Sequence, residues 1–111
     1  EIDAFRRLLE ARGCGIALID LGRIGGVTPW RHVASLAHGF GAMVGGHVLP
    51  EIHIHLLTAV PNSHIVEYVP RSARLLKAMP AMDGSEMIVP QGAGFGLALD
   101  PDAVQRFTVT N

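Results

Sequence analysis

Three residues of types that transfer protons stand at the ends of short apolar runs. They are Asp20, His47 and Glu67. Histidine titrates near neutral pH, so it can act as a general acid or a general base. A neighbouring carboxylate orients the ring and stabilises the imidazolium. A second carboxylic acid, kept protonated in a poorly solvated pocket, can donate a hydrogen bond to a developing oxyanion.

Together these groups are suited to removing a proton from a carbon next to a carboxylate. The enediolate that this reaction forms needs a divalent cation, and the sequence offers no cluster of carboxylates to hold one. Each residue alone also has an ordinary structural explanation: an aspartate caps a helix, a histidine is partly buried, a glutamate is solvated. The combination of three complementary types at three strand ends favours a shared site.

Alternating patterns predict the elements that must position these residues. Apolar residues at helical spacing predict three helices, over residues 2–12, 29–39 and 50–60. Three short apolar runs predict strands over residues 15–19, 42–44 and 64–68, and the first of them is expected to be buried on both faces. The segment GRIGGV at 22–27 predicts a loop, with Thr28 as N-cap and Pro29 in the first turn of the following helix.

The pattern becomes irregular after Pro70. Residues 71–77 predict one or two helical turns, and residues 87–89 predict a short strand. A loop rich in proline and glycine follows, and Pro101 opens a final short helix. This last part of the chain therefore does not continue the alternation of helices and strands.

The alternation itself predicts an α/β fold with a parallel sheet. Three parallel strands leave both edges of the sheet unpaired, so we expect further strands beside them. An open doubly wound sheet and an eight-stranded barrel both satisfy this pattern. In a barrel, the carboxyl ends of neighbouring strands meet at one mouth, which would bring Asp20, His47 and Glu67 together.

The composition is that of one globular domain rich in core residues. Of the 111 residues, 49% are hydrophobic and 17% are charged, and the formal net charge is −1. Without a basic patch, neither a nucleic acid nor an anionic membrane is an expected partner. No apolar run is long enough to span a membrane and no signal peptide is visible. A single cysteine, Cys14, allows no intrachain disulfide and fits a cytoplasmic protein; the lack of an initiator Met predicts a piece of a longer chain.

Three stretches resemble the mandelate racemase/muconate lactonizing enzyme family of the enolase superfamily. They are DLGRIGGVTPW at 20–30, GGHVLPEIHIHLLTAVPN at 45–62 and HIVEYV at 64–69. The tail MDGSEMIVPQGAGFGLALDPDAVQRF at 82–107 supports the resemblance more weakly. It implies the C-terminal part of a (β/α) TIM-type barrel, in which the chain supplies the last three parallel strands with their helices.

The resemblance also implies a division of the chain and its partners. Residues 1–77 would hold the βα units, and residues 78–111 an irregular tail that packs back on the barrel or on a capping domain. The expected partners are the remaining barrel strands, an N-terminal capping domain, a small carboxylate substrate and further copies of the same chain. Family members require Mg²⁺ held by three acidic residues on strands three to five, so the metal ligands are expected upstream and none in this chain.

Residue by residue, the resemblance assigns roles to the three strand ends. Asp20 resembles the aspartate of the family's His–Asp dyad, and His47 resembles the histidine that moves the substrate proton. Glu67 resembles the glutamate that hydrogen-bonds the substrate carboxylate as it becomes an enediolate. Substrate contacts are expected from Gly46, His47 and Glu67.

The expected function is Mg²⁺-dependent abstraction of the proton α to a carboxylate, leading to dehydration of an acid sugar. A racemase or epimerase of a 2-hydroxy acid is the alternative. A non-catalytic barrel fragment is a third interpretation, because the metal ligands are missing from the chain, and the fragment alone is expected to be inactive. A binding protein for a small anion would need a glycine-rich phosphate loop, which the RIGG segment matches poorly.

Residues around these positions carry further expectations. We expect a structural role for Arg23 rather than a contact with the dyad. Gly45 and Gly46 would give a substrate steric room beside His47, or only form a tight turn.

A zinc site is the alternative use of the histidines near His47. Glu51, His53 and His55 could join it, but a helix turns 53 and 55 apart and no fourth ligand converges. Packing and capping roles are therefore expected for the histidines, and Trp30 is expected in the core between helices.

Overall fold

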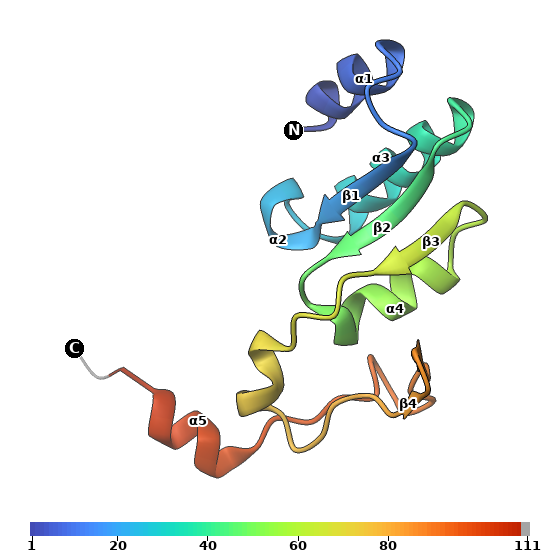
Figure 1. The fold of residues 1–111 in the computed structure, drawn as a ribbon. Coiled ribbons are helices and arrows are strands. Elements are labelled where there is room, and N and C mark those ends of the chain that lie inside the picture. Colours follow the sequence, from blue (N-terminus) through green and yellow to red (C-terminus); the bar gives the residue numbers. More distant parts are fainter. Residues whose placement is uncertain (110–111) are drawn as a thin grey trace.

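The computed structural model describes residues 1–109; residues 110 and 111, the end of the predicted tail, lie outside the described residues. Helices and strands alternate in the first two thirds of the chain (Figure 1). In order, the elements are α1 (Ile2–Glu10), β1 (Ile16–Asp20), α2 (Leu21–Ile24), α3 (Val27–Gly39), β2 (Met43–His47), α4 (Pro50–Thr58), β3 (Ser63–Val66), the 3₁₀ helix η1 (Arg71–Leu75), β4 (Met82–Asp83), β5 (Glu86–Met87) and α5 (Pro101–Phe107).

The first three strands form one parallel sheet in the order β1-β2-β3. The register pairs Asp20 with His47 and Gly45 with Ile65. Strands β4 and β5 form a separate antiparallel pair. The α/β fold with a parallel sheet, predicted from the alternation of patterns, is confirmed.

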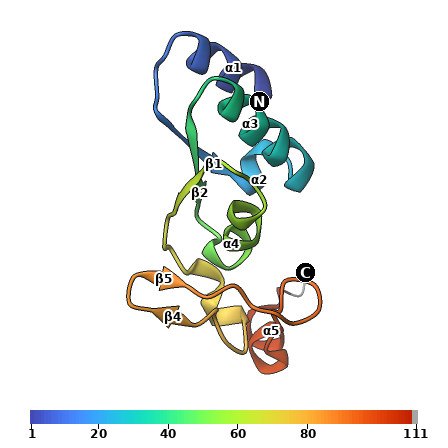
Figure 2. The same ribbon diagram turned by 90° about the vertical axis from the view of Figure 1, so that its right-hand side faces the viewer.

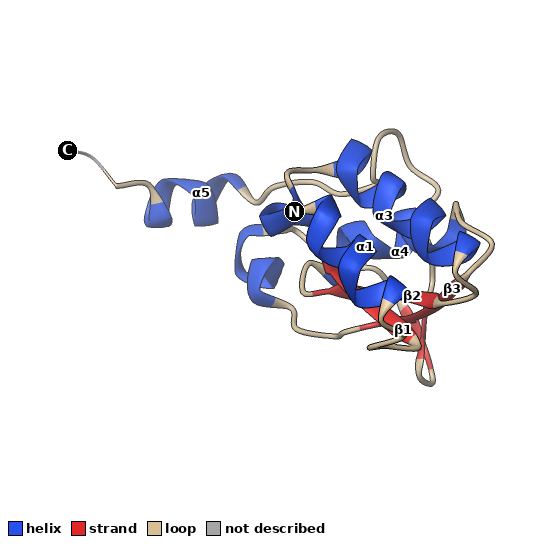
Figure 3. Ribbon diagram, turned by 90° about the horizontal axis from the view of Figure 1, so that it is seen from above, coloured by secondary structure: helices blue, strands red, loops and turns tan. Residues whose placement is uncertain are grey.

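Helices α3 and α4 pack on one face of this sheet (Figure 3). The side chains that point toward them are almost fully buried: Ala17 is 2% exposed, and Ile19 and Val44 are 0% exposed. Trp30 of α3 is also fully buried, and its ring lies against the ring of His53 on α4. The prediction that Trp30 belongs to the core between helices is confirmed.

The opposite face of the sheet is largely exposed in the described residues. Its apolar side chains are Ile16, Leu18, Met43 and Ile65, which are 37–54% exposed. Successive residues of a strand point to opposite faces, so these residues alternate with the buried set. The prediction that the strand at 15–19 is buried on both faces is therefore wrong for this chain taken by itself.

A short helix replaces the loop predicted at 22–27. Asp20 caps α2, because its Oδ1 accepts a hydrogen bond from the backbone N–H of Arg23 at 2.9 Å. Gly25 and Gly26 follow with φ of 98° and 108°, a region that costs glycine little. Helix α3 then begins at Val27 with Gly26 as its N-cap, so the prediction of Thr28 as the N-cap is wrong.

Strand boundaries also differ from the predictions: β3, predicted over 64–68, covers Ser63–Val66 and ends before Glu67. Strand β2 continues through Gly45, Gly46 and His47, because pairing with β1 on one side and β3 on the other holds the glycines extended. In the tail, the strand predicted at 87–89 is replaced by the β4–β5 hairpin, whose turn contains Gly84 at φ 57°.

The C-terminal part of the tail runs back beside the segment around η1 (Figure 2). Lys77 donates its backbone N–H to the carbonyl of Ala98, and Asp100 donates to Leu75, both at 2.9 Å. These bonds cross the predicted boundary between residues 77 and 78, and the division into two parts remains a prediction. No helix in residues 1–109 is both long and apolar enough to cross a lipid bilayer.

Candidate active site

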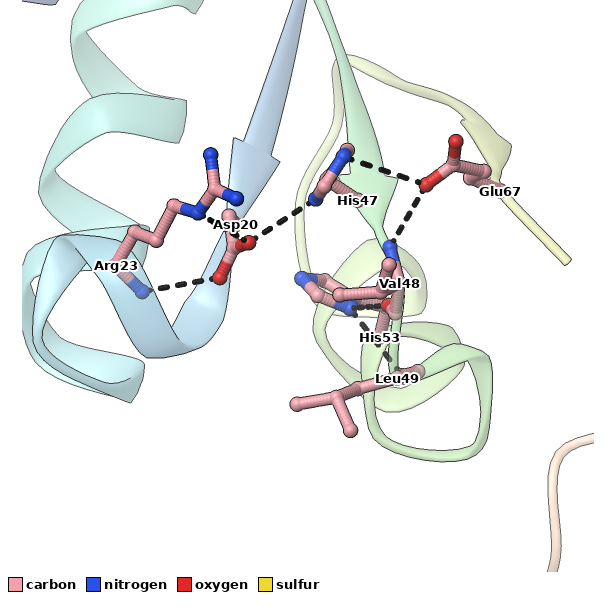
Figure 4. A network of polar contacts seen from close by, with 7 residues as sticks. All are labelled: Asp20, Arg23, His47, Val48, Leu49, His53 and Glu67. Carbon is pink, nitrogen blue, oxygen red and sulfur yellow. Dashed lines mark hydrogen bonds and ion pairs between the residues drawn. The ribbon is translucent and has the colours of Figure 1, made fainter. Parts of the chain in front are cut away.

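The parallel register brings the three predicted residues to one edge of the sheet (Figure 4). Asp20 and His47 are the last residues of neighbouring strands and are paired directly. Glu67 lies one residue beyond β3, and its backbone N–H donates to the carbonyl of Gly46 at 2.8 Å. The carboxyl ends of β1, β2 and β3 therefore present an aspartate, a histidine and a glutamate side by side.

Asp20 and His47 form a hydrogen-bonded pair. Nδ1 of His47 lies 3.0 Å from Oδ2 of Asp20. An ionised carboxylate only accepts hydrogen bonds, so Nδ1 carries the proton and Nε2 of the neutral ring has the free lone pair. The side chains are 18% and 32% exposed, so the pair is partly shielded from water but reachable from the open side of the sheet.

Arg23 strengthens the ionised state of Asp20. Its backbone N–H bonds Oδ1, and its Nε lies 3.4 Å from Oδ2. The pKa of Asp20 is lowered chiefly by the backbone hydrogen bond from Arg23 and further by the bond to His47, while burial opposes the shift. The expectation that Arg23 does not contact the dyad is wrong, although its side chain is 84% exposed.

Glu67 faces the other nitrogen of the histidine. Its Oε2 accepts the backbone N–H of Val48 at 3.0 Å and lies 3.6 Å from Nε2 of His47. The Glu67 side chain is 39% exposed in this chain, so the poorly solvated pocket expected for a protonated acid is not formed by the described residues alone. Substrate could therefore reach both His47 and Glu67 from the same side.

Gly46 does not leave room for a substrate. A Cβ at Gly46 would lie 2.5 Å from Cγ of His53, on the face that the helices cover. A Cβ at Gly45 would instead meet Cδ1 of Leu18 at 2.8 Å, on the exposed face. The contact of Gly46 with substrate remains a prediction, and it would have to come from the backbone.

A hollow of about 230 Å³ opens beside the Asp20–His47 pair. Its walls include Phe5, Leu18, Asp20, Arg23, Ile24 and His47. Glu1 also lines the hollow, so the wall combines a carboxylate and an aromatic ring from the start of α1 with the Asp20–Arg23 ion pair and the imidazole of His47. Such a mixture suits a small polar molecule with an apolar flank.

The residues considered for a zinc site have separate partners. Glu51 accepts a hydrogen bond from the hydroxyl of Ser72, Nδ1 of His53 bonds the carbonyl of Val48, and Nε2 of His55 bonds the carbonyl of Phe95. His53 also packs on Trp30, and His55 on Phe95, which confirms their packing roles. Within residues 1–109 no three His, Cys, Asp or Glu side chains converge to hold a metal ion.

Sequence reasoning missed the part played by the backbone of Val48. Its N–H is the hydrogen-bond donor that holds Glu67 beside His47. Every residue type except proline carries such a donor, so the side-chain pattern contained no signal for it. The hydrogen bond from Val48 to Glu67 therefore depends on how the chain turns after His47.

Residues 1–103 match the family model described as enolase C-terminal domain-like. The chain is 30% identical to a putative L-rhamnonate dehydratase of Caldivirga maquilingensis, over 95% of this chain and 29% of that protein. It is also 30% identical to a D-xylonate dehydratase of Haloferax volcanii, over 94% of this chain and 27% of that protein. The chain thus spans less than a third of the length of these curated relatives.

Solved structures similar to this chain come from the same kinds of enzyme. The structure of L-talarate dehydratase from Polaromonas sp. JS666, complexed with Mg and L-glucarate, matches with a TM-score of 0.87 and 30% identity, over 95% of this chain and 29% of that one. An enolase from Bradyrhizobium, complexed with magnesium and mandelic acid, matches with a TM-score of 0.88 and 28% identity, over 98% of this chain and 30% of that one. The predicted barrel segment of the enolase superfamily is confirmed as the fold of this chain.

Proposed function

The chain belongs to the enolase C-terminal domain-like family, and on that premise we propose that it supplies the proton-transfer residues of an enzyme that dehydrates an acid sugar. The reaction would remove the proton α to the carboxylate and expel the β-hydroxyl. The observation that carries the proposal is the 3.0 Å bond between Nδ1 of His47 and Asp20 at the exposed edge of the sheet. The dehydratases among the relatives favour this reaction over others of the superfamily.

His47 would move the proton through its Nε2. Because Nδ1 donates to Asp20, Nε2 has the lone pair that accepts a proton from the α-carbon. The ionised Asp20 then stabilises the imidazolium that forms. In the protonated form, the same nitrogen can donate its proton to the departing β-hydroxyl as a general acid.

Glu67 would bind the substrate carboxylate. Its Oε2 already accepts the N–H of Val48, so a proton on this side chain belongs on Oε1. From there it donates a hydrogen bond to the carboxylate oxygen on which negative charge grows. We propose that the rest of the barrel removes Glu67 from water and so favours the protonated acid.

We propose that Mg²⁺ binds to residues outside this chain, since residues 1–109 contain no set of ligands for it. When bound, the ion would offset the charge of the substrate carboxylate. Magnesium in the Polaromonas and Bradyrhizobium structures supports this assignment. The same proposal includes an N-terminal capping domain, association with further copies of the chain and a cytoplasmic location.

Turnover by the full-length enzyme with Mg²⁺ tests the proposal. The acids to try are L-rhamnonate, D-xylonate, L-talarate and L-glucarate, with the 2-keto-3-deoxy product trapped by semicarbazide. His47→Asn should lower kcat by about 10²- to 10⁴-fold, because the ring is the general acid and base. His64→Asn changes an exposed histidine at the start of β3 and is the matched control. Full turnover by His47→Asn would remove this residue from the reaction.

Racemisation is the second candidate, favoured by the mandelic acid in the Bradyrhizobium structure. The same enzyme is incubated with one enantiomer of mandelate in D₂O and followed by ¹H NMR and chiral chromatography. Loss of the α-proton signal and formation of the other enantiomer, without any keto acid, would support a racemase. Absence of turnover with every acid tried would favour a non-catalytic barrel.

A further inference from the structure

The link between β2 and α4 has an unusual backbone. Only Val48 and Leu49 connect the strand to the helix, and their φ angles are +50° and +44°. Residues other than glycine avoid this left-handed region, and a β-branched residue such as valine avoids it most. Each such residue costs about 1–3 kcal/mol, so neighbouring groups must hold the conformation.

The side chain of His53 is the group that holds it. His53 is 0% exposed, and its Nδ1 lies 2.6 Å from the carbonyl oxygen of Val48 and 3.2 Å from that of Leu49. Both partners are acceptors, so Nδ1 carries a proton and donates it to the turn. The ring fits only because position 46 is glycine, since a Cβ there would overlap Cγ of His53.

The left-handed turn also directs a hydrogen-bond donor toward the candidate site. The N–H of Val48 precedes its own α-carbon, and its C=O follows it. These two groups are related by φ and ψ of Val48. Because the turn is also anchored by β2 before it and by α4 after it, the bond from His53 to the C=O restricts both angles, and with them the direction of the N–H. That N–H bonds Oε2 of Glu67 at 3.0 Å, and the same oxygen lies 3.6 Å from Nε2 of His47 (Figure 4).

We propose that His53 is a positioning residue for Glu67: it holds the left-handed Val48–Leu49 turn and thereby keeps the Glu67 carboxyl group against His47. The inference rests on the proposed function, because the reaction is what gives this placement a consequence. His53 acts from the helix-covered side of the sheet, while the substrate would approach from the other side. It therefore need not touch the substrate itself.

Two substitutions separate positioning from packing. His53→Asn places an amide nitrogen at the same number of bonds from Cβ as Nδ1, so it keeps the donor but leaves space beside Trp30. His53→Leu fills more of this space but has no donor. A purely structural role would make kcat follow thermal stability, with Leu better than Asn, whereas positioning predicts the reverse order of kcat.

The first measurement needs no substrate. Hydrogen–deuterium exchange of the Val48 amide is measured at single-residue resolution in the full-length enzyme. His53→Leu should exchange about tenfold faster than wild type, which corresponds to the loss of one hydrogen bond, and His53→Asn should stay close to wild type. His55→Leu, a histidine of the same helix that bonds Phe95 instead, is the control. Equal protection of Val48 in wild type and His53→Leu would overturn the proposal.

The second measurement uses whichever of the four acid sugars the wild type turns over. His53→Leu should lower kcat by about 10- to 100-fold with little change in KM, and His53→Asn should recover most of it. Lost protection of Val48 with unchanged kcat would overturn the positioning role. If the wild type turns over none of the acids, the proposed function fails, and the exchange measurement alone still decides whether His53 holds the turn.

Discussion

The two faces of the same three strands differ sharply. On the face covered by α3 and α4, Ile19 and Val44 are fully buried. On the other face, Leu18 and Ile65 are equally apolar but 43% and 54% exposed. Within each strand, alternate residues therefore belong to a buried core layer. The residues between them form an apolar layer that is exposed in this chain.

This difference indicates how the site is supported. On the covered face, the ring of His53 occupies the space that Gly46 leaves, and its Nδ1 lies 2.6 Å from the carbonyl oxygen of Val48 in the turn after His47. The uncovered face ends in Asp20, His47 and Glu67, which is where a substrate can enter. The proposed chemistry lies on the face that this chain does not complete, and the proposed positioning residue His53 acts from the face that it does.

The largest expected effect comes from cutting an apolar side chain on each face in the full-length enzyme. Ile19→Ala should lower the free energy of unfolding by about 2–5 kcal/mol, because a fully buried side chain leaves a cavity. If the remaining barrel strands cover the other face, Leu18→Ala should cost a similar amount. Urea denaturation of both variants measures the two losses.

A cost for Leu18→Ala of less than about 0.5 kcal/mol would place that side chain at the surface of the full-length enzyme. The uncovered face would then be no part of a barrel interior, and the comparison between the faces would describe an ordinary one-sided sheet.

An intermediate effect is expected from the neighbouring glycines of β2. Gly46→Ala should destabilise the enzyme by about 1–3 kcal/mol, because the new methyl group overlaps the buried ring of His53. Gly45→Ala should cost less, because the closest atom is the mobile end of Leu18, although the carbonyl of Ile65 at 3.1 Å must also yield a little. Thermal unfolding of the two variants gives the order, and a larger loss for Gly45→Ala would reverse our assignment of the tighter face.

The smallest effect concerns the polar edge of the uncovered face. Folding lowers the pKa of Asp20, so its contribution to stability is complete above about pH 4 and is lost as the pH falls through the lowered value. Asp20→Asn should therefore cost about 0.3–1 kcal/mol at pH 7, and the difference from wild type should be smaller at pH 2.

Urea denaturation at both pH values measures this difference. Asp102→Asn, in the first turn of α5, removes a helix-dipole charge without the contacts to His47 and Arg23 and serves as the control. A penalty for Asp20→Asn that is the same at pH 2 and pH 7 would mean that the charge of Asp20 contributes nothing.

Much of the fold was accessible from local patterns. The three apolar runs did become neighbouring parallel strands, and Asp20 and His47 do meet at their ends. The segment after Asp20 was harder, because a helix of only four residues leaves no periodic apolar pattern. It forms because the side chain of Asp20 caps it, so one residue both ends a strand and starts a helix.

The sequence by itself determined the order of helices and strands and the chemical types at the strand ends, because both follow from spacing along the chain. The tertiary structure alone decided which nitrogen of His47 faces Asp20, which side of the sheet uses the space at Gly46, and that Val48 holds Glu67 through a left-handed turn. These features depend on contacts between strands and across the sheet. Such contacts exist only once the β-strands are paired and α4 is packed against them.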